Sequence, residues 1–98
     1  MAKKGYLISA YRSINDPDKL AAYAKLAGPA FGKYGAKYLV RDTAAQAYEA
    51  GVKQRTVIVE FESVAKAIEA HDSPDYQAAL KVLGNAVERD MRIVEGLE

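Results

Sequence analysis

One feature of this sequence limits its possible folds more than any other: the same helix-start signal occurs twice. Residues 16–18 read Asp-Pro-Asp, and residues 73–75 read Ser-Pro-Asp. In each signal a capping oxygen precedes a proline at the first helical position, and an acidic residue follows in the first turn. Apolar residues at helical spacing follow both signals, and strand-like runs surround them. This order predicts two β-α-β units within one small α+β domain.

Four segments are predicted to be strands. Residues 5–12 and 55–62 are rich in branched and aromatic side chains, residues 36–41 form a shorter run, and residues 91–95 lie near the end of the chain. The resulting order β-α-β-β-α-β is the ferredoxin-like plan, with a four-stranded antiparallel sheet and both helices on one face. All 98 residues are assigned to this single domain.

The two helical regions have distinct expected features. The first begins at Pro17, and Gly28-Pro29 is expected to kink it because a proline inside a helix removes a hydrogen bond. In the second region, Ser63 is expected to cap a short helix that runs through Ala70, and a further helix follows residue 73. Its predicted apolar stripe comprises Tyr76, Ala79, Leu80, Leu83 and Val87.

The sheet face away from the helices needs a cover. It is expected to carry Leu7, Tyr11 and Ile58, which are too apolar to be left in water. No further element of the chain is available to bury them, so a homodimer is predicted. Two sheets packed face to face would close a dimeric α+β barrel and bury on the order of 1,200–2,000 Å² or more. Residues 42–54 are predicted to form a mobile hairpin arm with a functional or interface role.

Charge and composition exclude several classes of partner. The chain has 14 basic and 13 acidic residues, which are interspersed, so it lacks the basic strip that nucleic acid requires. It contains no cysteine, which excludes disulfides and thiolate catalysis and fits a cytoplasmic location. Its apolar runs are too short for a signal peptide core or a membrane span. A soluble cytoplasmic protein without nucleic-acid or membrane partners is therefore expected.

A family resemblance adds to these patterns. Residues 5–41 and 55–80 resemble the bacterial family called domain of unknown function 1330, most specifically in YLVR (38–41), VEF (59–61) and SPDYQ (73–77). That family is similar in fold to the dimeric α+β barrels, which include small monooxygenases, muconolactone-type isomerases and haem-degrading enzymes. The resemblance implies a dimeric barrel and no particular activity. The chain departs from the family in reading Gly-Ala-Lys-Tyr at residues 35–38, where a glycine pair commonly precedes the tyrosine.

Glu60 is the first candidate catalytic residue. It lies in an otherwise apolar strand, and its place in the alternation directs it to the face away from the helices. A carboxylate there is costly unless it is paired. Glu60 is therefore either a general base or ligand anchor, or the partner of a basic residue that holds a dimer together. Arg41 is expected to lie near Glu60 and to bind either that acid or an anionic ligand. Arg55 is a second candidate for this role and is interpreted mainly as a solvated strand end.

His71 is the second candidate catalytic residue and the only histidine in the chain. It lies in the break between two helical segments, where a near-neutral imidazole could move a proton. The alternative is a surface or interface histidine without catalytic role. Neighbouring Ser73 is interpreted mainly as a helix cap and is kept as a binding candidate. A Ser-His-Asp triad from residues 71–73 is excluded because adjacent side chains cannot adopt its geometry.

Three tyrosines complete the candidate binding set: Tyr11, Tyr38 and Tyr76. They either line a small apolar cavity or pack in the core, with each buried hydroxyl needing a partner. The sequence contains no metal-ligand cluster and no phosphate-binding loop, so no metal and no cofactor are expected.

Three hypotheses about function remain open. The chain binds a small apolar or carboxylated metabolite, or it is a cofactor-independent enzyme of isomerase or monooxygenase type that uses Glu60 or His71. The third hypothesis is a structural dimer that docks another protein, with the 42–54 arm as the surface that matters most. Whether the chain is an enzyme is not decided by its sequence.

Overall fold

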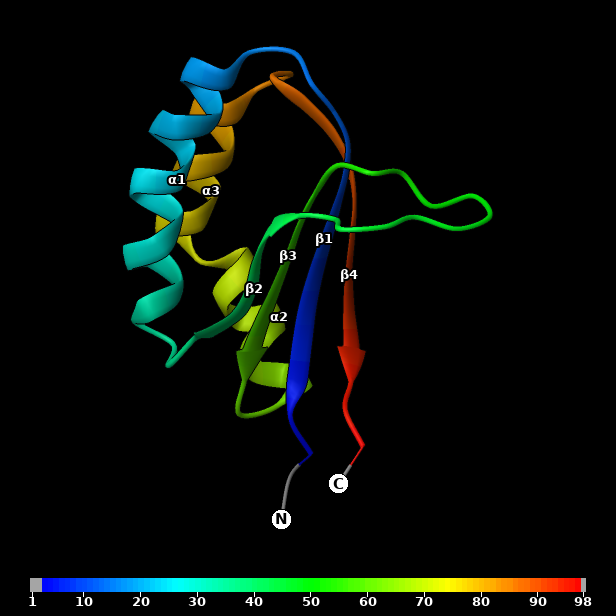
Figure 1. Ribbon diagram of the computed structural model, residues 1–98. Coiled ribbons are helices and arrows are strands. Elements are labelled where there is room, and N and C mark those ends of the chain that lie inside the picture. The colour runs from blue at the N-terminus through cyan, green and yellow to red at the C-terminus, as the bar shows by residue number, and fades with distance from the viewer. Residues whose placement is uncertain (1–2, 98) are drawn as a thin grey trace.

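The computed structural model describes residues 3–97 and contains the predicted alternation of strands and helices (Figure 1). The second helical region is divided into two helices. In chain order the elements are β1 (Gly5–Ile14), α1 (Pro17–Gly32), β2 (Lys37–Thr43), β3 (Arg55–Phe61), α2 (Val64–Asp72), α3 (Pro74–Leu83) and β4 (Val87–Glu95).

The strands form one antiparallel sheet in the order β2-β3-β1-β4, and the helices cover one of its faces (Figure 1). The α+β ferredoxin-like prediction is confirmed. Both central strands, β1 and β3, are flanked by neighbours on two sides. The space between these central strands and α1 therefore lies at the middle of the domain.

Both predicted helix starts are confirmed. The Asp16 side chain accepts a hydrogen bond from the backbone N–H of Lys19 at 3.1 Å, which caps α1. The Ser73 hydroxyl accepts from the backbone N–H of Tyr76 at 3.3 Å and donates to the carbonyl of Ala70 at 2.7 Å. Ser73 thus ends α2 and begins α3 with one side chain. The helix α1 continues through its internal proline to Gly32 without a break.

The final strand is longer than predicted. It begins at Val87 rather than Met91, and it pairs with nearly the whole of β1. Val87 therefore belongs to β4 and not to the preceding helical stripe. Residues 88–90 are all charged, so the sequence alone does not identify this half of the strand. It forms because the central strand β1 extends to Ile14 and pairs with it.

The two faces of β1 were assigned the wrong way round. Leu7 and Tyr11 are 1% and 4% exposed and lie under the helices, not on the uncovered face. Both faces of this strand are apolar, so alternation alone could not tell which one meets the helices. The uncovered face instead carries Tyr6 and Ile8, beside Ile58 of β3, whose predicted position is confirmed.

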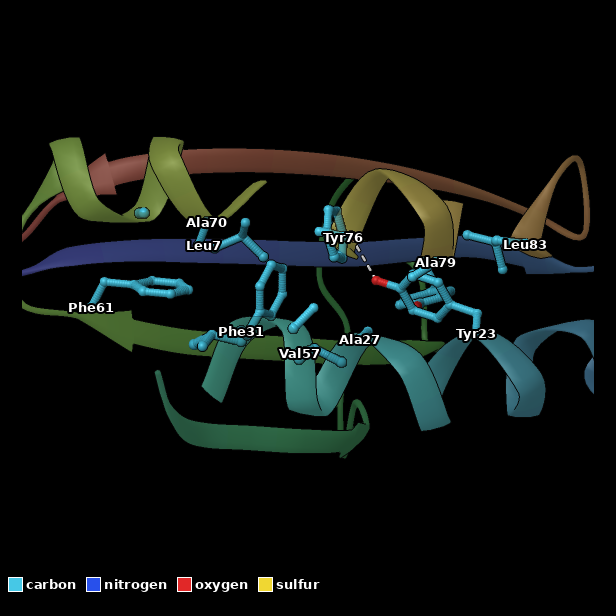
Figure 2. Close-up of a cluster of buried hydrophobic side chains, with 14 of the residues drawn as sticks. Leu7, Tyr23, Ala27, Phe31, Val57, Phe61, Ala70, Tyr76, Ala79 and Leu83 are labelled. Carbon is cyan, nitrogen blue, oxygen red and sulfur yellow. Dashed lines mark hydrogen bonds between the residues drawn. The ribbon is translucent and has the colours of Figure 1, made fainter. Parts of the chain in front are cut away.

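Aromatic side chains dominate the core between the sheet and the helices. Phe31 lies between Phe61 and Tyr76 (Figure 2), edge-on to the first at 5.6 Å between ring centroids and stacked on the second at 4.4 Å. Tyr76 is fully buried. This packing joins α1, α3 and β3 and holds the helices at a fixed distance above the sheet.

The segment between β2 and β3 forms a long arm. Residues 44–54 contain no helix or strand, and in Figure 1 they project from the sheet on the side opposite the helices. Tyr48 is 76% exposed near the end of this arm, and Val52 is also exposed. An arm is therefore present where it was predicted, but it begins at residue 44 rather than 42 because β2 extends through Thr43.

Candidate functional site

A small cavity lies between the sheet and α1, and we refer to it as the α1 pocket. Its volume is about 40 Å³, and it lies next to the aromatic core. Its apolar wall includes Leu7, Phe31 and Val59. Its polar side chains are Ser9, Tyr11, Tyr23, Tyr38, Arg41, Arg55 and Arg89. Within the described residues, the lining includes three arginines and no acidic side chain.

Arg89 is the central polar residue of the α1 pocket. Its guanidinium donates to the hydroxyl of Tyr11 at 3.0 Å, to that of Tyr23 at 3.3 Å and to that of Tyr76 at 3.2 Å. The Tyr23 and Tyr76 oxygens are themselves 2.6 Å apart (Figure 2). Strand β4 supplies the arginine, β1 supplies Tyr11, and α1 and α3 supply the other two tyrosines. Four elements therefore meet at one cation.

The electrostatics of this cluster are unusual because, within residues 3–97, its positive charge has no carboxylate partner and Arg89 forms no salt bridge. Burial raises the pKa of Tyr76, with the neighbouring Tyr23 as a second cause, so its hydroxyl stays protonated at neutral pH. Arginine is always protonated in proteins. The cluster therefore holds a net positive charge in a half-buried position.

Arg41 reaches this pocket because β2 contains a bulge. Tyr38 pairs with Val59 and Val40 pairs with Ile58, which leaves Leu39 as an extra residue between them. The extra residue reverses the alternation, so Arg41 shares the helix-covered face with Tyr38. The Arg41 guanidinium lies 5.0 Å from the centre of the Tyr38 ring, a cation–π contact.

The predicted proximity of Arg41 and Glu60 is wrong. Arg41 pairs with Val57, while Glu60 pairs with Lys37 and faces away from the helices. On that face Glu60 accepts a hydrogen bond from the hydroxyl of Tyr6 at 3.1 Å. The bulge at Leu39 is the physical reason, because it places Arg41 on the opposite side of the sheet.

His71 also lies apart from the α1 pocket. It is in the last turn of α2, where its Nδ1 is 2.9 Å from a carboxylate oxygen of Asp72 and its ring centroid is 5.2 Å from that of Tyr76. Ser73 acts as the shared cap described above. The structure therefore brings Tyr11, Tyr38 and Arg41 together at the pocket, with Tyr76 behind it, and leaves Glu60, His71 and Ser73 outside.

Comparison with known proteins places the chain in a family. The family model described as "Domain of unknown function (DUF1330)" matches residues 4–97. The chain belongs to the DUF1330 family. The resemblance seen in the sequence is thus confirmed over nearly its whole length. No curated protein matches this DUF1330 chain.

Solved structures similar to this DUF1330 protein share its fold. The RPA0582 protein of unknown function from Rhodopseudomonas palustris is 22% identical, with a TM-score of 0.72 over 100% of this chain and 85% of that one. A dimeric ferredoxin-like protein of unknown function from Thermobifida fusca is 16% identical, with a TM-score of 0.65 over 97% and 92%. SnoaB, a cofactor-independent oxygenase from Streptomyces nogalater, is 8% identical, with a TM-score of 0.63 over 99% and 96%.

Residues 3–97 contain no group of three or more His, Cys, Asp or Glu side chains arranged to hold a metal ion. None of the helices in this range combines the length and the apolar character that crossing a membrane requires.

Sequence reasoning missed three polar residues of the DUF1330 pocket: Ser9, Tyr23 and Arg89. Tyr23 follows the apolar spacing of its helix and so carries no sign of a polar role, and Arg55 was interpreted mainly as a solvated strand end. A signal for Arg89 did exist, because it alternates with Val87, Met91 and Ile93 along one face of β4. An arginine in such a series is a candidate for burial against the core.

Proposed function

We propose that this protein binds a small metabolite with an apolar body and a negative charge in the α1 pocket. The observation that carries the proposal is Arg89, a half-buried cation surrounded by hydroxyls and without an acidic partner in residues 3–97. Removing a charge from water is costly unless an opposite charge replaces the lost solvation. A bound anion would supply that charge.

The other lining residues support the same ligand chemistry. Arg41 and Arg55 add two further cations to the pocket, and the aliphatic and aromatic wall offers an apolar surface to the ligand body. Arg41 is exposed and Arg89 is half-buried, so the pocket has an outer and an inner positive group. This combination favours an amphipathic anion over a neutral or cationic molecule.

The expected result for Arg89→Gln is a loss of ligand-induced stabilisation. In a thermal-shift screen of anionic and neutral metabolites, a ligand at a hundred times its dissociation constant adds about 2.7 kcal/mol to the wild-type protein. The variant keeps hydrogen-bond donors but has no charge, so its affinity for anionic hits should fall at least about tenfold. Lys25→Gln, an exposed change on the solvent side of α1, is the matched control. Anionic hits that stabilise both variants equally would rule out this function.

The uncovered sheet face supports a homodimer as the binding unit. It carries Tyr6, Ile8 and Ile58, and a neighbour in structure, the protein from Thermobifida fusca, is described as dimeric. We propose that a second copy of this chain covers the face. The side chains of two such faces would then meet in a shared interior.

Ile58→Asp should therefore dissociate the dimer. A carboxylate at the centre of a packed interface loses its hydration without gaining a partner, so the dimer dissociation constant should rise on the order of a hundredfold or more. Sedimentation velocity at micromolar concentration measures this shift. The control is Ile68→Asp, because Ile68 is an exposed apolar residue on α2 in the helical layer. A wild-type protein that is already monomeric at this concentration would contradict the dimer.

A cofactor-independent enzyme is the second candidate function. It is favoured by the likeness in fold to SnoaB, a cofactor-independent oxygenase. In this reading Glu60 or His71 moves a proton, and Glu60→Gln abolishes turnover while leaving the dimer intact.

A structural dimer that docks a protein through the exposed Tyr48 of the arm is the third candidate. It predicts that changes in residues 42–54 matter more than changes in the pocket.

A further inference from the structure

The protons of the Arg89 cluster have only one low-energy arrangement. Tyr76 is fully buried, and its oxygen lies close to two groups, the Tyr23 hydroxyl and the Arg89 guanidinium. Arginine can donate but not accept, so Tyr23 is the one acceptor found for the Tyr76 proton among the described residues. The opposite direction would leave a buried hydroxyl proton unpaired, at a cost of about 1–3 kcal/mol. Tyr76 therefore donates to Tyr23.

This arrangement leaves two tyrosine protons available to the α1 pocket. The Tyr23 oxygen accepts from both Tyr76 and Arg89, which occupies its lone pairs and leaves its own proton free. The Tyr11 oxygen accepts from Arg89, and no acceptor for its proton is found within residues 3–97. Both side chains line the pocket, whereas Tyr76 does not.

Ser9 is an independent sign that the pocket has a polar occupant. It is only 2% exposed, it lines the pocket, and its hydroxyl makes no hydrogen bond within residues 3–97. In the same range, no side-chain polar atom is both sealed from solvent and unpaired. Because the Ser9 oxygen is unpaired, it must be accessible to solvent, and the pocket that Ser9 lines provides that access. Ser9 and Tyr11 point to the same face of β1, so both side chains face the pocket.

From these positions we infer that the α1 pocket recognises an ionised carboxylate and discriminates against the matching amide. Its inner wall donates hydrogen bonds from Arg89, Tyr11, Tyr23 and Ser9, and within the described lining no acidic or histidine side chain accepts one. An ionised carboxylate only accepts hydrogen bonds, so it satisfies this wall. An amide offers one acceptor oxygen in place of two and no charge to pair with Arg89, so part of this donor wall would be left without an acceptor. The inference deepens the proposed function and rests on it.

The size of the pocket sets the orientation of the ligand. A cavity of about 40 Å³ has room for a few water molecules or for a carboxylate with a few carbon atoms. The exposed lining residues, Ala24 and Arg41, mark the side that opens to solvent. A monocarboxylate thus enters with its acid group first, while a larger body extends toward Tyr38 at the opening. The ligand class is a short aliphatic or a small aromatic monocarboxylate.

Matched acid and amide probes test the inference. Butyrate is compared with butanamide, and benzoate with benzamide, by NMR titration of the full chain at constant ionic strength. The acids should bind at least tenfold more tightly than the amides. The double variant Tyr11→Phe/Tyr23→Phe keeps both rings and Arg89 but removes both protons, and it should weaken acid binding at least tenfold. Tyr48→Phe, in the exposed arm, is the control and should bind like the wild type.

Different results would contradict the carboxylate preference and the proposed binding of an anionic metabolite. Unchanged acid binding in the double variant overturns the donor-wall inference alone and leaves Arg89 to hold the anion. Equal binding of acids and amides overturns both the donor-wall inference and the preference for an anion. Failure of all four probes to bind also overturns the donor-wall inference, while the Arg89→Gln screen still judges the proposed function. Should the double variant fold poorly by its melting temperature, Ser9→Ala provides the second test, with a loss of acid affinity but not of amide affinity expected.

Discussion

Phe61→Ala is expected to lower the free energy of unfolding by about 3–5 kcal/mol. The side chain is 1% exposed and meets the ring of Phe31 edge-on, so its removal leaves a cavity in the aromatic core. The Phe31 ring is held by helix α1 and by its stacking on Tyr76, so it cannot collapse fully into that cavity. Since a domain of this size has a total stability of about 5–15 kcal/mol, this variant should be close to unfolding.

Urea unfolding followed by circular dichroism measures the effect. Phe61→Leu is the matched variant, because it keeps most of the volume, and it should cost less than about 1.5 kcal/mol. Ile68→Ala tests an apolar residue that is 46% exposed, where the loss should be small. Equal losses for Phe61→Ala and Ile68→Ala would contradict the assignment of Phe61 to the core.

Gly5→Ala is the second change with a large expected effect on stability. A β-carbon at Gly5 would lie 2.5 Å from the carbonyl oxygen of Ser63 and 2.7 Å from the α-carbon of Val64. These are backbone atoms of the turn from β3 into α2, so no side chain can rotate away. The strand or the turn must shift, and we expect a loss of about 3 kcal/mol, the upper end for overpacking.

The control for Gly5→Ala is a substitution of the same kind with the opposite expected sign. Gly28 lies inside α1, and a β-carbon there would meet nothing within 4 Å. Gly28→Ala should therefore stabilise the protein by about 0.5–1 kcal/mol through the higher helix propensity of alanine. Chemical denaturation of both variants decides the matter. If Gly5→Ala were as stable as Gly28→Ala, the close approach of β1 to the turn would be disproved.

Local chemistry made the elements of this fold predictable. The proline-containing helix starts are such short-range signals, since Asp16 and Ser73 form their capping hydrogen bonds within three residues of themselves. The helix-then-strand order followed from them, and the ferredoxin-like arrangement followed from that order. Glu60 was also placed on the correct face, because β3 alternates cleanly between buried and half-buried residues.

The site was harder to predict because it depends on pairing between distant strands. Arg89 takes its role from contact with Tyr11, which lies 78 residues earlier, and neither residue carries a local signal of that contact. The faces of β1 could not be told apart, since Tyr6 and Ile8 are nearly as apolar as the residues they alternate with. Tyr11, Tyr38 and Tyr76 were recognised by residue type alone, and the cation that unites two of them went unnoticed.

The bulge at Leu39 has a consequence for how relatives of this protein diverge. Deleting that one residue would restore plain alternation in β2 and keep Arg41 opposite Val57 on the pocket face, whereas pairing the same residues without a bulge would transfer Arg41 to the sheet face that carries Glu60. A charge at the opening of the pocket can thus be gained or lost through the bulge itself, without any substitution of the arginine. Ligand preference among homologues should accordingly follow the presence of this bulge as well as substitutions. An alignment that closes a gap at this position by sliding the strand would assign the arginine to the wrong surface.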